Sequence, residues 1–107
     1  MTIKSYQNLI AWQKAIDLCE AIYKASSAFP PQELYGLTSQ IRRAAVSVPS
    51  NIAEGAGRIT NGEFLQSVGH ARGSLLEVET QVIIAQRFSY IESTESDLLL
   101  QTFLGEC

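Results

Sequence analysis

Residues 40–58 constrain the fold of this chain more than any other segment, because two helical patterns run through them. One is apolar, with steps of 4, 3 and 4 that are typical of a buried helix face: Ile41, Ala45, Val48 and Ile52. The other is polar, with steps of 3, 4, 4, 3 and 4 that average 3.6 residues: Gln40, Arg43, Ser47, Asn51, Glu54 and Arg58. The segment therefore predicts an amphipathic helix with an ordered polar edge, which we call the polar stripe.

A proline and two glycines modify this helix. Pro49 removes one backbone donor and crowds the carbonyl of Ala45, so a kink is expected there, with a full break at Val48 as the alternative. Gly55 and Gly57 supply the left-handed geometry with which many helices end. The helix is therefore expected to stop around Gly55–Gly57.

Three more helices are predicted around this segment. The first runs from about Ser5–Asn8 to Ala25–Ser27, where two prolines follow, and Trp12 is its expected core anchor. The third begins at a capping box, Thr60-Asn-Gly-Glu63. The fourth begins near Thr94 and is much shorter, with about ten residues.

The third helix carries a wide apolar face. Its members are Phe64, Val68, Ala71, Leu75, Val78 and Val82, with Leu65, Leu76 and Ile83 widening the face. Arg72 and Glu79 are seven residues apart and fall inside the same arc. A charged pair on a wide apolar face predicts a polar contact within the bundle or between subunits.

Four helical segments without strand-like alternation predict an all-α protein. The expected architecture is an up-down-up-down antiparallel four-helix bundle with a short fourth helix, as a single domain over residues 1–107. A fourth helix of this length leaves one end of the bundle uncovered. Either the chain is truncated, or another subunit fills the gap. A chain of 107 residues is marginal for stability, so oligomerisation would help it.

Several functional classes lack support in the sequence. No run approaches the ~20 apolar residues of a membrane span, and the first residues lack a secretion signal, which favours a cytoplasmic location. Cys19, Cys107 and His70 form neither a disulfide framework nor a metal site. Glu77 and Glu79 are two residues apart on a helix and cannot act as paired carboxylates. We therefore expect a non-enzymatic protein without metal or cofactor.

The charge distribution leaves two interpretations of the polar stripe. The net charge is −3, with +2 in residues 1–76 and −5 in residues 77–107, which argues against broad nucleic-acid affinity. In the first interpretation the stripe is an assembly seam, in which Arg43 pairs with Glu54, Glu77 or Glu79. In the second it is a ligand surface: Arg42, Arg43 and Arg58 contact phosphates, and Gln40 and Asn51 contact bases or sugars.

Stretches over nearly the whole chain resemble the 23S rRNA-intervening sequence protein family, also called four helix bundle proteins. They are Asn8-Leu-Ile-Ala-Trp-Gln-Lys-Ala15, Tyr35-Gly-Leu-Thr-Ser-Gln-Ile-Arg-Arg-Ala-Ala-Val-Ser-Val-Pro-Ser-Asn-Ile-Ala-Glu-Gly55, Glu63-Phe64 and Ala71-Arg-Gly-Ser-Leu-Leu-Glu-Val-Glu79. The family-typical positions implied are Gln40, Arg42, Arg43, Ser47, Pro49, Asn51, Glu54, Gly55, Gly73, Ser74 and Glu77.

The resemblance implies an antiparallel bundle that assembles as a homopentamer in bacteria. Genes of the family occur in insertions within 23S rRNA genes, which makes RNA an expected partner. A related fold is the accessory protein of diversity-generating retroelements, where a basic pentamer engages reverse transcriptase and nucleic acid. The expected function is therefore a ring-shaped homo-oligomer that contacts RNA, or alternatively a scaffolding module that binds a nucleic-acid-processing protein. This chain departs from the family in being acidic overall and in its short fourth helix.

Overall fold

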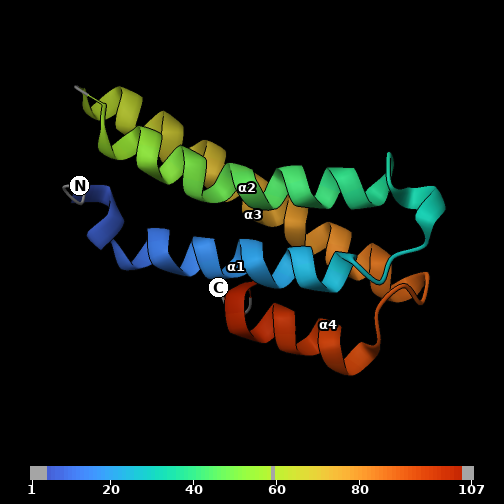
Figure 1. The fold of residues 1–107 in the computed structure, drawn as a ribbon. Helices are drawn as coiled ribbons and strands as arrows, with labels where there is room; N and C mark the ends of the chain where they lie inside the picture. Colours follow the sequence, from blue (N-terminus) through green and yellow to red (C-terminus); the bar gives the residue numbers. More distant parts are fainter. Residues whose placement is uncertain (1–4, 59, 105–107) are drawn as a thin grey trace.

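The computed structural model describes residues 5–58 and 60–104, which form four α-helices joined by short turns (Figure 1). The helices are α1 (Ile10–Ser26), α2 (Leu37–Ala56), α3 (Asn61–Arg87) and α4 (Ser93–Leu99). Two 3-10 turns, η1 (Ser5–Asn8) and η2 (Pro31–Glu33), precede α1 and α2, and a π-helical turn, η3 (Leu100–Leu104), continues α4. The predicted all-α class with four helices is confirmed, since no strand occurs in the described ranges.

The helices surround one apolar core. Figure 1 shows α1 and α2 side by side, with α3 behind them and α4 along the lower side of α1. The largest fully buried side chains come from the three long helices: Leu18, Ile22, Ile41, Val78 and Val82. Leu99 of α4 belongs to this cluster, and Phe103 of η3 packs against it. In the part of the chain that the structure describes, no helix is both long and apolar enough to cross a membrane.

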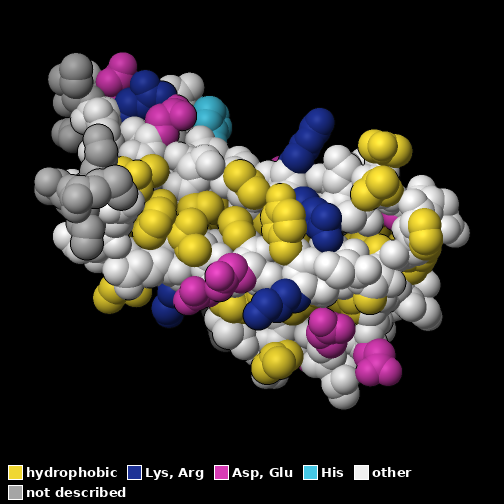
Figure 2. Space-filling model, viewed as in Figure 1, with side chains coloured by type: hydrophobic (Ala, Val, Ile, Leu, Met, Phe, Trp, Pro, Cys, Tyr) yellow, Lys and Arg dark blue, Asp and Glu magenta, His cyan; other side chains and the backbone are white. Residues whose placement is uncertain are grey.

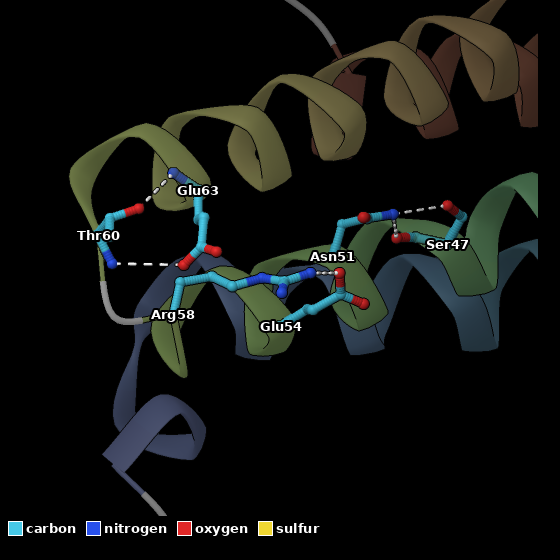
Figure 3. A network of polar contacts seen from close by, with 6 residues as sticks. All are labelled: Ser47, Asn51, Glu54, Arg58, Thr60 and Glu63. Carbon is cyan, nitrogen blue, oxygen red and sulfur yellow. Dashed lines mark hydrogen bonds and ion pairs between the residues drawn. The ribbon is translucent and has the colours of Figure 1, made fainter.

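The junction between α2 and α3 follows the local sequence signals. Helix α2 ends at Ala56 with Gly57 as its C-cap, as predicted, although the φ of Gly57 is −93°, so the expected left-handed geometry is wrong. The predicted capping box at the start of α3 is confirmed (Figure 3). The Thr60 hydroxyl accepts the Glu63 N–H at 3.1 Å, and the Glu63 carboxylate accepts the Thr60 N–H at 3.4 Å.

Helix α2 runs without a break through Pro49, so the alternative of a break at Val48 is wrong. Proline has no N–H, which leaves the carbonyl of Ala45 without its usual donor four residues later. That carbonyl accepts a hydrogen bond from the Cys19 thiol of α1, with an Sγ–O distance of 3.0 Å. Burial raises the pKa of Cys19, which keeps the thiol protonated as a donor. A contact between helices thus satisfies the carbonyl that Pro49 leaves free.

The start of α2 is held by Glu33. One carboxylate oxygen accepts the N–H of Leu37 at 2.9 Å, and the other accepts the hydroxyl of Tyr90 at 2.7 Å. Both hydrogen bonds lower the pKa of Glu33, and the one from Leu37 has the larger effect. The same carboxylate raises the pKa of Tyr90. A Cβ at Gly36 would lie 2.6 Å from the Glu33 carboxylate, so glycine permits this approach.

Two expectations about the core are wrong. Trp12 is only half-buried and lies outside the core cluster, where its ring meets that of Tyr6 edge-on at 5.5 Å. The first half of the predicted apolar face of α3 is exposed, with Phe64 at 45% and Val68 at 41%. Helix α4 and η3 run beside the second half of α3 only: Gln86 bonds Ser93, and Phe103 shares a cavity with Leu75. Nothing described covers the preceding turns of α3 from that side.

Candidate functional site

The middle of the polar stripe lies in the contact between α2 and α3. The Ser47 hydroxyl is 2.8 Å from the hydroxyl of Ser74 on α3. The Asn51 amide donates to the Ser47 carbonyl at 2.8 Å and to the Ser47 hydroxyl at 2.9 Å (Figure 3). These three residues form one hydrogen-bonded cluster. The sequence places Ser47 and Asn51 on one edge correctly, but it gives no sign that Ser74 is their partner.

The last turn of the stripe forms a local ion pair. Glu54 and Arg58 are four residues apart and bonded to each other (Figure 3), with side chains 56% and 39% exposed. Such a pair on a helix surface contributes roughly 0.3–0.5 kcal/mol. It leaves Arg58 engaged by a neutralising partner rather than free for a phosphate.

Gly55 has a packing role that its interpretation as a helix-ending residue misses. A Cβ at this position would lie 3.2 Å from the Cβ of Ser67 and 3.6 Å from the ring of Phe64. Gly55 and Ser67 are both buried where α2 crosses α3. Small residues here let α2 and α3 approach each other closely.

Arg42 of α2 forms hydrogen bonds to α1. Its Nε donates to the Ser26 hydroxyl at 2.7 Å, and its Nη2 donates to the Tyr23 carbonyl at 3.3 Å. The guanidinium carbon also lies 4.6 Å from the centroid of the Tyr23 ring, a cation–π distance. The side chain is half-buried. Arg42 therefore helps to hold α1 against α2, so it is not a free arginine of the kind that the ligand-surface interpretation expects.

A polar groove of about 280 Å³ runs along the stripe between α2 and α3, lined by Gln40, Arg43, Ala44, Ser47, Ser74, Glu77 and Gln81. Arg43 and Glu77 thus face the same groove, as the assembly interpretation expects. Within the described residues, however, Arg43 forms no ion pair with Glu54, Glu77 or Glu79. The side-chain carbonyl of Gln81, a residue 9% exposed, has no hydrogen-bond partner there either.

A larger and more apolar groove of about 720 Å³ lies on the other side of Arg43. It is lined by Tyr23, Leu34, Tyr35, Thr38, Ser39, Arg42, Arg43, Val46 and Ser47. The side chain of Tyr35 is 93% exposed, that of Leu34 52% and that of Val46 43%. Figure 2 shows hydrophobic side chains gathered over α2 and its border with α1 on this face, with basic side chains beside them. Arg43 therefore stands between an apolar groove and a polar one.

The remaining candidate residues are dispersed. His70 is exposed on α3, and Glu79 is half-buried on a side of α3 that does not line the polar groove. In the described ranges, no three metal-ligating side chains come together.

Two comparisons with known proteins bear on this geometry. The family model described as 23S rRNA-intervening sequence protein matches residues 7–104. No curated protein matches the chain. The matched range includes the polar stripe, both grooves and all four helices.

Proposed function

The chain belongs to the 23S rRNA-intervening sequence protein family, and from that premise we propose that it is a non-enzymatic, self-assembling scaffold of the bacterial cytoplasm. Its unit is an up-down-up-down antiparallel bundle without a cofactor. Its assembly is a closed ring of identical subunits, a pentamer in the form that the family resemblance implies. The ring holds RNA or a nucleic-acid-processing protein as its partner.

The apolar surface of the single subunit supports assembly. Four of the large apolar side chains exposed in the described chain gather around one groove: Tyr23, Leu34, Tyr35 and Val46. Contiguous apolar surface of this kind marks interaction sites in soluble proteins. The single observation that carries the proposal is the apolar groove around Tyr35, because an aromatic ring 93% exposed beside Arg43 is typical of an interface.

Charge favours a second copy of the chain as the occupant of that groove. A ring contact joins two different surfaces of identical subunits. Arg43 gives the groove a cation without an ion-pair partner in the described chain. Residues 77–107 carry a net charge of −5. Figure 2 shows acidic side chains along the lower edge of the molecule, over α1 and α4. One subunit thus offers both a basic apolar surface and an acidic one.

Tyr35→Ala is expected to weaken assembly and leave the subunit fold intact. Loss of an aromatic anchor from an interface costs at least about 1.4 kcal/mol, so the subunit dissociation constant should rise about tenfold or more. The 93% exposed ring contributes little to the isolated subunit. Multi-angle light scattering over a concentration series measures the change.

The matched control is Ile10→Ala, which also removes an exposed apolar side chain, 70% exposed, but outside the groove. It should keep the wild-type mass. A wild type that is monomeric at every concentration would refute the proposed function.

RNA contact is the second candidate function, and Arg43 is the observation that favours it. Arg42 is bonded to α1 and Arg58 to Glu54, whereas Arg43 is exposed between the two grooves. In a ring, one such arginine per subunit is repeated around the axis, which multiplies a weak single contact.

Arg43→Ala is expected to weaken binding of a labelled single-stranded RNA at low salt and to reduce the salt slope by about one per site. Fluorescence anisotropy at several salt concentrations measures both. Arg58→Ala is the control, because Glu54 already neutralises that side chain. Absence of RNA binding by the wild type at low salt would eliminate this candidate.

A further inference from the structure

We propose that α3 carries a second, self-complementary contact, through which two copies of the chain pair with their α3 helices antiparallel about a two-fold axis. The contact surface is the outer stripe of α3, which we define as Leu65, Val68, Arg72, Leu76, Glu79, Ile83 and Gln86. This proposal rests on the proposed function, since it also requires assembly. It names a different surface and a different symmetry from the ring contact.

The spacing of the outer stripe is that of a helix-pairing seam. Its members follow one another at steps of 3, 4, 4, 3, 4 and 3, the alternation with which one helix packs along another. The buried face of α3 uses other positions, among them Ala71, Ser74 and Val78. Helix α3 is thus apolar on two sides, and a helix with this property is usually covered on both.

The apolar members of the outer stripe are uncovered in the single subunit. Leu65 is 65% exposed, Val68 41%, Leu76 53% and Ile83 41%. Gly69 and Gly73 of α3 also face open space, since a Cβ added at either position would meet nothing within 4 Å. Only the last member, Gln86, is tied to another described element, through its bond to Ser93 at 3.2 Å.

The order of residues along the stripe is complementary to itself when reversed. In an antiparallel pair centred between Leu75 and Leu76, positions equally far from the centre face each other. Val68 then meets Ile83 of the second copy, and Arg72 meets its Glu79. The two-fold axis repeats both contacts.

Charge selects the antiparallel direction. A parallel pair in the same register would place Arg72 against Arg72 and Glu79 against Glu79, which is repulsive. Within one helix the two residues are seven positions, or about 10.5 Å, apart, too far for an ion pair. Neither has an ion-pair partner in the described part of the chain. A second copy supplies one for each.

The two-fold contact is distinct from ring closure. A ring needs two different surfaces, whereas the outer stripe pairs with itself. Assemblies held by it contain an even number of chains, as a simple dimer or as two rings joined face to face.

The test exchanges charges on the full-length chain. In every pair, Arg72→Glu sets two carboxylates against each other, and Glu79→Arg sets two guanidinium groups against each other. Each variant alone should raise the dissociation constant of the pair about 100-fold, since like charges in contact cost several kcal/mol. When the two variants are mixed, a pair with one chain of each kind has two contacts. One joins the two introduced side chains and the other joins the native Arg72 and Glu79, so both contacts are opposite in charge. The mixture should therefore regain the wild-type mass in light scattering, with both variants in equal amounts.

Arg87→Glu is the matched control, because it makes the same charge change on α3 outside the stripe and should leave the mass unchanged. Circular dichroism checks that each variant keeps its helix content, and Arg72→Glu combined with Glu79→Arg in one chain should assemble like the wild type. An oligomeric wild type whose mass neither single variant lowers would overturn the two-fold contact and leave the proposed function standing. A mixture that stays at the mass of the single variants would do the same. A monomeric wild type would overturn both.

Discussion

Ile41→Ala is expected to lower the free energy of unfolding by about 2–5 kcal/mol, the largest loss we anticipate from one substitution. Ile41 is 2% exposed and belongs to the cluster in which α1, α2 and α3 meet. Removing its side-chain carbons takes away apolar burial and leaves a cavity that neighbouring helices fill only in part. A domain of this size is stable by roughly 5–15 kcal/mol, so the variant loses a large share of the total.

Urea denaturation followed by circular dichroism measures this loss, at one protein concentration because assembly adds to apparent stability. Ile10→Ala is the matched control, since Ile10 is 70% exposed, lies outside the groove around Tyr35, and its truncation should cost about 0.5 kcal/mol or less. Equal losses for the two variants would contradict the placement of Ile41 in the core.

Arg42→Ala is expected to cost about 1–3 kcal/mol of stability, although arginine at a surface position is usually dispensable. The substitution removes the hydrogen bonds to Ser26 and Tyr23 and the contact of the guanidinium with the Tyr23 ring. It also leaves the hydroxyl of Ser26, a residue 2% exposed, without this donor. Arg42→Lys should lose most of the same stability, because a lysine ammonium cannot reproduce the two donors of the guanidinium fork.

Arg43→Ala provides the comparison, since the adjacent residue is exposed and forms no ion pair among the described residues. At a protein concentration low enough to keep both proteins monomeric, its unfolding free energy should match that of the wild type. If Arg42→Ala were as stable as Arg43→Ala, the contacts of Arg42 with Ser26 and Tyr23 would make no measurable contribution to the free energy of unfolding.

The helix boundaries were predictable because their signals are local. The capping box of Thr60 and Glu63 and the stop beside Gly57 depend on residues within a few positions of one another. The periodicity of residues 40–58 likewise identifies which edge of α2 is polar. Spacing along one helix determines which side chains share a face, whatever the rest of the chain does.

The contacts that define the site depend on which helices become neighbours, and for that reason sequence reasoning missed them. Ser47 meets Ser74 across 27 positions, Arg42 meets Ser26 across 16, and Cys19 meets the Ala45 carbonyl across 26. Periodicity also identifies an apolar face without showing what covers it. The exposed Phe64 and Val68 are the clearest case, since their pattern is the same as that of the buried Val78 and Val82.

The hydrogen bond from Cys19 to the Ala45 carbonyl gives the chain an internal reporter of helix separation. Alkylating reagents react with the thiolate, and a thiol with a raised pKa that is also engaged as a donor reacts slowly. Modification of Cys19 is expected to become faster when α1 moves away from α2, because that movement releases the thiol from the Ala45 carbonyl. The alkylation rate of this one sulfur therefore tracks the local opening of the bundle, separately from its global unfolding.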